Sequence, residues 1–292
     1  MAGSRVRGAP GERSLRRSLL AYALLAPSVA IFVVFTYAPW IRSLGWGTYE
    51  SRRGGAAYEQ VGLDLYREVL TGSDFWAGVW HSTVFVLITV PLGLIAGILL
   101  AVAADRRLRG IRFFQVVFSS TVASSTAVTS VIFLYLFSAT GPFGLTWLQK
   151  SSTVLPAIAL SSVWQSLGLA FIIVLAGLQA IPDEVVEAAR LDGYSAWRML
   201  TRITLPLLAP VLLFLIVVLV IFGFQAYAQV DLMTRGRGGP GGAAETLLFK
   251  IFANSDPDTV TIGSVMSFGL FVLTCIAVYG QFRLLERRVR DV

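Results

Sequence analysis

The side chains of this chain that could do chemistry are neutral polar groups set inside long apolar runs. They fall into three clusters: Ser161, Trp164 and Gln165; Gln225, Tyr227 and Gln229; and Ser264 with Ser267. A glutamine amide surrounded by hydrocarbon must find a hydrogen-bond partner. Amides, hydroxyls and aromatic rings together match the hydroxyl groups and apolar face of a sugar or polyol. Each residue alone serves equally well as glue between helices, but together they favour a polar cavity.

Spacing adds a geometric expectation to the second cluster. Gln225 and Gln229 are four residues apart, which predicts that both lie on one face of a helix. An earlier apolar run, residues 113–137, carries eight serine and threonine residues. Small hydroxylated residues let membrane helices approach closely and hydrogen-bond across the contact. Packing is the first interpretation of that run, and lining a solute path is the alternative.

Ionised groups are absent from the hydrophobic middle of every apolar run. Proton- and sodium-coupled carriers normally keep such groups at mid-membrane, so the driving force is expected to come from elsewhere. The single cysteine, Cys275, excludes an intrachain disulfide and a thiolate metal cluster, and we expect it to be a small buried residue. No catalytic triad or metal set can be assembled around the single histidine, His81.

The elements that must position these groups are membrane helices. The chain has 292 residues, of which 55% are hydrophobic and 14% charged, which is the composition of a polytopic membrane protein. A bilayer needs about 20 apolar residues per helix. We therefore predict an all-α fold with six spans, at about residues 19–40, 78–103, 113–137, 154–180, 207–230 and 260–284.

The net charge of +7 follows the span ends, which argues for topology signals rather than for nucleic-acid binding. Lys and Arg are about twice as frequent on the side that holds both termini as on the other. This bias predicts a multi-pass protein with both termini in the cytoplasm. The expected division is a basic N-terminus (1–18), a membrane domain (19–284) with a cytoplasmic loop at 181–206, and a tail (285–292).

That loop between the fourth and fifth spans keeps helical spacing although it is polar. Pro182 suits the first turn of a helix, and acidic residues follow it near the positive helix end. Gly193 allows the positive φ that ends this helix, and Ser195 can cap the next one, which we expect to stop at Pro206. The pattern predicts two short helices at an angle, exposed to water as a docking element.

The same loop resembles the EAA loop of permease subunits in binding-protein-dependent ABC importers. The family pattern is Glu-Ala-Ala, three residues, Gly, nine residues, then Ile-x-Leu-Pro, and its spacing is intact here. The residues that the resemblance assigns to coupling with an ATPase are Glu187, Ala188, Ala189, Asp192, Gly193, Ile203, Leu205 and Pro206. An ordinary amphipathic connector does not explain the placement of the glycine and the proline.

Other segments resemble the carbohydrate-type members of that family. Thr234 through Gly239-Pro240 to Glu245-Thr246-Leu247 is similar to a segment after their fifth span, with an inserted Arg-Gly. The intervening glycines are no phosphate cradle, because the Lys-Ser/Thr of a P-loop is missing. The tail from Gln281 to Arg290 looks like the ending of the first permease subunit of glycerol-phosphate importers.

The resemblance implies a bacterial inner-membrane complex. Its other parts would be a second homologous permease subunit, two ABC ATPase subunits that bind ATP and magnesium, an extracytoplasmic solute-binding protein and membrane lipid. No cofactor is expected in this chain, nor is it expected to be an enzyme. A neutral sugar, a glycerol phosphate and a glycerophosphodiester all stay open as substrates. The alternative is a secondary carrier, or another polytopic protein, with a coincidental loop.

Overall fold

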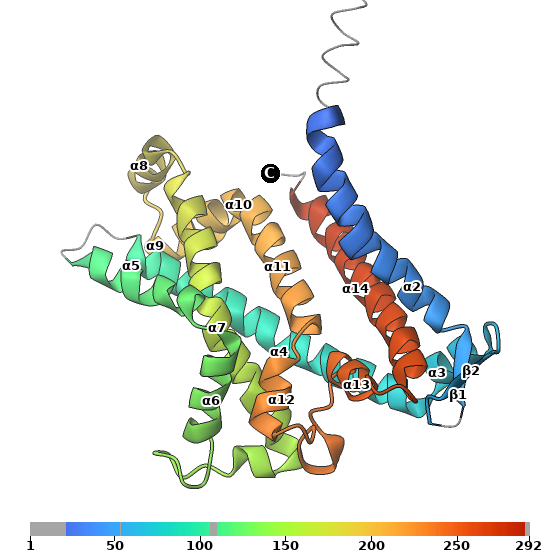
Figure 1. The fold of residues 1–292 in the computed structure, drawn as a ribbon. Coiled ribbons are helices and arrows are strands. Elements are labelled where there is room, and N and C mark those ends of the chain that lie inside the picture. The colour runs from blue at the N-terminus through green and yellow to red at the C-terminus, as the bar shows by residue number, and fades with distance from the viewer. Residues whose placement is uncertain (1–21, 53, 106–109, 290–292) are drawn as a thin grey trace, which may run out of the picture.

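The computed structural model describes the chain except for residues 1–21, 53, 106–109 and 290–292, so the expected basic segment 1–18 lies outside the described part. The described part is almost entirely helical, with one two-stranded hairpin (Figure 1). In chain order the elements are η1 (Val33–Tyr37), α2 (Ala38–Trp46), β1 (Tyr49–Arg52), β2 (Ala57–Gln60), α3 (Asp64–Thr71), α4 (Ser73–Ala104), α5 (Ile111–Ser119), η2 (Ser120–Ala123), α6 (Thr126–Leu136), η3 (Trp147–Gln149), α7 (Ser151–Gln179), α8 (Asp183–Leu191), α9 (Ala196–Met199), η4 (Leu200–Thr204), α10 (Leu205–Leu207), α11 (Ala209–Phe224), α12 (Ala228–Thr234), η5 (Pro240–Gly242), α13 (Leu247–Ala253) and α14 (Val260–Val289).

Four helices of the described residues are long and apolar enough to cross a membrane by themselves: Tyr22–Trp46, α4, α7 and Val260–Arg283 of α14. Two further spans result if each of two sharply bent helix pairs crosses once. The prediction of an all-α polytopic membrane protein is therefore confirmed. The expected tail begins inside α14, which continues to Val289.

The third expected span, 113–137, is not a straight helix. Its two halves, Ile111–Ala123 and Thr126–Leu136, meet at 102°. Ser125 causes the restart, because its hydroxyl accepts a hydrogen bond from Val128 N at 3.2 Å and caps α6. The hydropathy of the sequence does not predict this bend, because both halves of the span are apolar.

The fifth expected span, 207–230, is also interrupted. The preceding helix does not stop at Pro206 but continues to Leu207, and α11 then leaves it at 72°. A π-helical turn, in which Leu205 N donates to Leu200 O, comes immediately before the proline. The wider turn accommodates a ring that would collide with the α-helical carbonyl four residues earlier. At its far end α11 stops at Phe224, and α12 starts only at Ala228.

The centre of the fold is the crossing of α4 with α7. Gly97 of α4 meets Ala170 of α7 so closely that an added Cβ would lie 2.6 Å from the Ala170 Cβ. Around this crossing, Phe171 and Val174 of α7 and Leu215 of α11 are buried in a shared apolar core. Small residues are therefore what bring the backbones of α4 and α7 together.

We expect Gly97→Val to lower the stability of the protein by about 1–3 kcal/mol, the usual cost of forcing extra atoms into a packed contact. The melting temperature of the detergent-purified protein measures the effect. Gly45→Val is the control, because an added Cβ at Gly45 meets nothing within 4 Å. Equal melting temperatures for the two variants would contradict the role given to Gly97.

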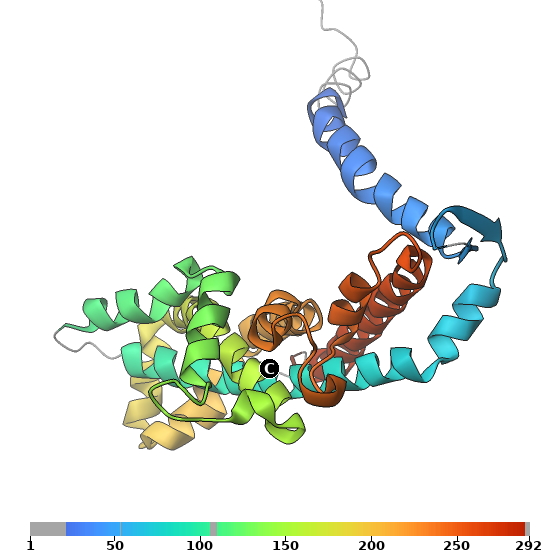
Figure 2. The ribbon, with the colours of Figure 1, turned by 60° about the horizontal axis from the view of Figure 1, so that its bottom comes forward.

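One end of the molecule carries the hairpin β1–β2, which the sequence did not predict. The Tyr58 hydroxyl donates to Pro257 O at 2.8 Å and so ties the hairpin to the turn that precedes α14. Trp40 packs edge-on against Phe271 of α14. Figure 1 draws α2 along α14, and in Figure 2 the two helices come together near the hairpin. The expectation that Cys275 is buried was wrong, because α14 leaves it exposed.

Candidate functional site

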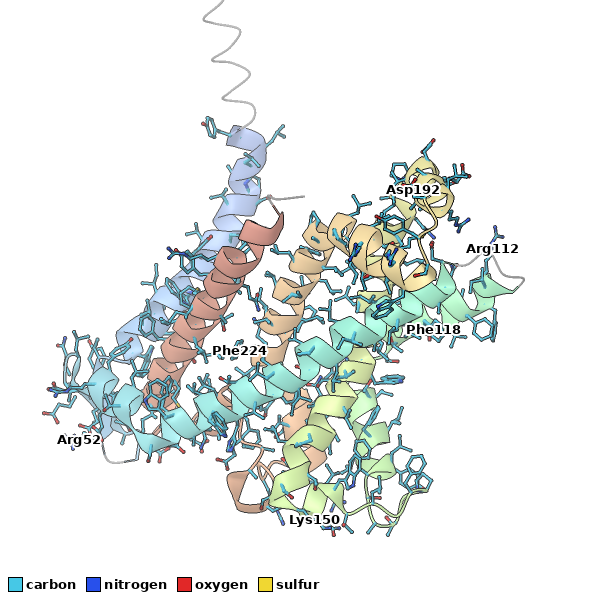
Figure 3. All side chains as sticks on the ribbon, turned by 180° about the vertical axis from the view of Figure 1, so that it is seen from behind. Arg52, Arg112, Phe118, Lys150, Asp192 and Phe224 are labelled. Carbon is cyan, nitrogen blue, oxygen red and sulfur yellow. The ribbon has the colours of Figure 1, made fainter. Side chains whose placement is uncertain are left out.

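Two regions match the sequence expectations, and the first is the loop 181–206. Asp192 lies at one end of the molecule, and Arg52 and Lys150 lie toward the other (Figure 3). The first helix of the loop, α8, ends in two hydrogen bonds: Tyr194 N to Ala189 O and Gly193 N to Arg190 O, each 3.1 Å. This is a Schellman ending, which requires a left-handed residue, and Gly193 has φ +75°.

This ending explains why Ala189 and Gly193 stand at a fixed distance in the sequence. In a Schellman ending, the carbonyl that accepts from the residue after the left-handed one belongs to the residue four positions before the left-handed one, which here is Ala189. Ala189 is also buried, at 4% exposure, where a larger side chain would not fit without rearrangement. Ser195 then caps α9, since its hydroxyl accepts from Arg198 N at 3.4 Å. The two-helix expectation for this loop is met by the structure.

The outward face of the loop is apolar at two points. Leu191 is 89% exposed and Trp197 is 72% exposed. Glu187 lies one turn before Leu191, is exposed and forms no ion pair with another residue in the described part of the chain. Exposed leucine and tryptophan side chains on a polar loop are suited to contact with a protein partner.

The second region is a cavity of about 710 Å³ where the two broken spans meet α7. Its walls come from α4, η2, the start of α6, α7, the end of α11, the segment 225–227, α12 and α13. No Asp, Glu, Lys, Arg or His is among the described residues that line it. Its polar groups are hydroxyls and amides, so it suits a neutral hydroxylated ligand.

A relay of side-chain hydrogen bonds crosses one side of this cavity. Gln229 Nε2 on α12 donates to Gln165 Oε1 on α7 at 3.1 Å, and Gln165 Nε2 donates to Thr126 Oγ1 on α6 at 2.8 Å. Gln165 thus links three helices, two of which begin at breaks in the spans. The Ser162 hydroxyl also lines the cavity and has no hydrogen-bond partner among the described residues.

Aromatic rings supply an apolar wall. Tyr227 stacks on Phe252 of α13 with ring centroids 4.2 Å apart and an interplanar angle of 26°. Both rings line the cavity, together with Phe85 of α4 and Phe222 of α11. Flat rings beside amide groups offer a ligand both stacking and hydrogen bonding.

Half of the residues that the sequence assigned to a solute path line the cavity. Gln165, Gln225, Tyr227 and Gln229 do so. The reason given for Gln225 and Gln229 was wrong, because the helix breaks between them and they do not share one helical face.

The other four residues of that set face elsewhere. Ser161 is fully buried against Met233, with its hydroxyl 3.4 Å from the thioether sulfur, and Trp164 packs on Phe133. Ser264 and Ser267 return their hydroxyls to carbonyls of their own helix, at 2.8 Å each. Sequence reasoning missed Thr89, Thr121 and Thr126 as lining residues. The hydroxyl-rich third run was the signal for the last two, but packing was the first interpretation of it.

Sequence reasoning also missed a buried cation. Lys250 of α13 is 8% exposed, and its Nζ lies 2.5 Å from Asp74 Oδ1 and 2.8 Å from Glu245 Oε2. Burial lowers the pKa of Lys250, but the hydrogen bonds and charges of the two carboxylates raise it by more, so the net pKa is above its usual value. The ion pairs stabilise the folded chain fully at any pH below the pKa that Lys250 has in the unfolded chain. This stabilisation is lost as the pH rises through the higher pKa that Lys250 has in the folded chain. Lys250 therefore stays charged at neutral pH.

Comparison with known proteins identifies the family to which the chain belongs. Residues 89–291 match the model of the family described as "Binding-protein-dependent transport system inner membrane component". The chain is 31% identical to the sn-glycerol-3-phosphate transport system permease protein UgpA of Yersinia pestis bv. Antiqua, over 96% of this chain and 99% of that protein. It is 30% identical to the protein of that name from Agrobacterium fabrum, over 93% and 96%.

Solved structures share the fold. A chain of a bacterial ABC transporter involved in the import of the acidic polysaccharide alginate superposes with a TM-score of 0.78 at 20% identity, covering 96% of this chain and 99% of that one. A chain of the MetNI methionine ABC transporter gives 0.52 at 16% identity, covering 73% and 94%. With the family match and the relatives above, this chain belongs to the binding-protein-dependent transport system inner membrane components, the permease subunits of ABC importers.

Proposed function

We propose that this chain is one of two related permease subunits of an ATP-driven importer, and that it passes a sugar or glycerol-phosphate-type solute through the cavity at the broken spans. The ATPase subunits dock on the loop 181–206, and an extracytoplasmic binding protein delivers the solute at the opposite end. The relatives named as glycerol-phosphate permeases and the fold shared with an alginate importer support this substrate range.

The observation that carries the proposal is the shape of the loop. A Schellman ending at Gly193 and a Ser195 cap fix two helices at an angle, with Leu191 and Trp197 facing outward. Such an element can transmit a rigid-body movement, because its hydrogen bonds are satisfied internally and its exposed apolar groups are left for a partner. Its position at one end of the molecule leaves it free to meet the ATPases, which the proposal sets on the cytoplasmic side (Figure 3).

The cavity supports the solute path. It lies between helices that end inside the fold, and its lining of amides, hydroxyls and stacked rings is neutral. Unwound helix ends near the middle of the membrane are where transporters commonly bind solutes. A phosphate group on the solute would need its countercharge from another source, such as the second permease subunit, since a buried unpaired anion is costly.

We expect the chain, purified by an affinity tag from its native membrane in mild detergent, to bring with it an ABC ATPase and a second permease subunit. In proteoliposomes this complex should accumulate a radiolabelled solute only when ATP is supplied on the Asp192 side and the loaded binding protein on the other. Glycerol 3-phosphate, a glycerophosphodiester and a neutral disaccharide are the solutes to compare. Uptake driven by a proton gradient without ATP would instead support a secondary carrier.

A further inference from the structure

The ion-paired Lys250 lies on a helix that forms part of the cavity wall, but it faces away from the cavity. Leu248 and Phe252 line the cavity from α13 and are four residues apart, so they share one face of that helix. Lys250 lies between them on the opposite face, where Asp74 of α4 and Glu245 receive it. The ammonium group thus holds the wall in place and is not presented to a solute.

Two more bonds attach the same segment to the first part of α4. His81 Nδ1 is 3.1 Å from Glu245 O, and Leu247 N donates to the Ser82 hydroxyl at 2.8 Å. The segment is also joined to the break in the fifth span, because Thr246 Oγ1 donates to Ala226 O at 3.2 Å. A movement of α13 relative to α4 would therefore move the segment 225–227, which itself lines the cavity.

The two carboxylates of the ion-paired cluster are not equivalent. Glu245 is five residues from Lys250 on the same segment, and its side chain packs against Gly238 and Gly242, so it moves with α13. Asp74 belongs to α4, and its side chain is 64% exposed, compared with 30% for Glu245 and 9% for Lys250. If α13 separates from α4, Asp74 regains water easily, and Lys250 keeps Glu245 as a partner.

An arrangement of this kind lowers the cost of opening. A buried cation that loses its only partner is strongly disfavoured, whereas an exposed ion pair is weak. Because Lys250 always retains one carboxylate, breaking its bond to Asp74 resembles breaking an exposed pair. The remaining bonds of the segment to α4, at His81 and Ser82, are single hydrogen bonds that water can replace.

We propose that Lys250 is a releasable latch, and that α13 is a gate which opens the cavity at the end opposite α8 when the bond between Lys250 and Asp74 breaks. Figure 1 places α13 toward that end, which is the extracytoplasmic side under the proposed function, on which this inference rests. Lys250 is a positioning residue that controls access to the cavity through Leu248 and Phe252. Its ammonium group holds α13 against α4 and does not contact a solute in the cavity.

The first test measures access directly. Cys275→Ser removes the single cysteine, and Leu248→Cys places a thiol on the cavity wall. In right-side-out membrane vesicles that contain the whole complex, an impermeant maleimide should label this thiol at least fivefold faster when Asp74→Asn is added. Asp64→Asn, which removes an acid of α3 outside the ion-paired cluster, is the matched control and should not change the rate. Equal rates in the Asp74→Asn and parental chains would overturn the latch.

The second test locks the gate. Asp74→Cys and Lys250→Cys in the Cys275→Ser background can be bridged by a short cleavable reagent with two thiosulfonate groups. ATP-driven uptake should fall at least tenfold after bridging and return after reduction. If the bridged complex imports at the unbridged rate, α13 is only a structural wall and the proposal fails.

The labelling experiment needs neither ATP nor transport, so it judges the latch by itself. A parental complex that never imports a solute would defeat the proposed function and leave the labelling result standing. Conversely, normal import together with unchanged labelling would defeat the latch and leave the proposed function intact.

Discussion

Gly193→Val should reduce ATP-driven uptake at least tenfold while the complex still assembles. Gly193 has φ +75°, in the left-handed region, which costs an ordinary residue about 1–2 kcal/mol and a β-branched residue more. An added Cβ at this position meets nothing within 4 Å, so the effect cannot come from a collision. It must come from the backbone, which would leave the Schellman ending and change the angle between α8 and α9.

The matched control is Gly193→Asn, because asparagine tolerates the left-handed conformation far better than valine does. We expect it to keep most of the uptake. ATPase activity and uptake are measured together in proteoliposomes, and the valine variant should lose the dependence of hydrolysis on the loaded binding protein. If both variants import at the parental rate, the loop does not act as a lever.

The fold was predictable where the signal was local. Gly193 and Ser195 lie where the sequence placed them, because a left-handed helix ending and an N-terminal cap depend on a few neighbouring residues. The apolar runs were long enough to mark the spans. In each case the physics acts within about one helical turn or along one apolar run.

The breaks in the spans were harder to predict because hydropathy averages over them. Ser125 caps α6 by the same rule that Ser195 follows, but it lies in a hydroxyl-rich run that also suits close helix packing. Gln225 was placed on a helical face that does not exist, since α11 ends at Phe224. Both errors have one cause: an apolar segment was assumed to be one helix.

Contacts between distant segments could not be predicted at all. Lys250 pairs with Asp74, which is 176 residues away, and nothing in the spacing of either indicates the other. The same holds for Ser161 and Trp164, which share α7 with Gln165 but face Met233 and Phe133 instead of the cavity. A helix can be inferred from one sequence. Which of its side chains face a cavity, and which pack on other helices, depends on the helices that surround it.

Among the residues of the cavity, Gln165 should have the largest effect on transport. It accepts from Gln229 and donates to Thr126, so Gln165→Leu breaks both bonds at once. Leaving a buried polar group without a partner costs about 1–3 kcal/mol. We expect the transport rate at low solute concentration to fall between about fivefold and about 150-fold, as that range of free energy implies. Gln229→Leu breaks one bond and should have a smaller effect.

Gln179→Leu is the matched control, since Gln179 is an exposed amide at the end of the same helix, outside the cavity. It should leave uptake unchanged.

The dependence of uptake on solute concentration then separates two roles for Gln165. A higher half-saturating concentration with an unchanged maximal rate indicates that the amide binds the solute. A lower maximal rate alone indicates that the relay holds α6, α7 and α12 in register. Parental uptake in Gln165→Leu would show that the solute passes through another part of the complex. Among the hydrogen bonds of the described residues, no other side chain joins Gln229 to Thr126 and could replace the lost amide.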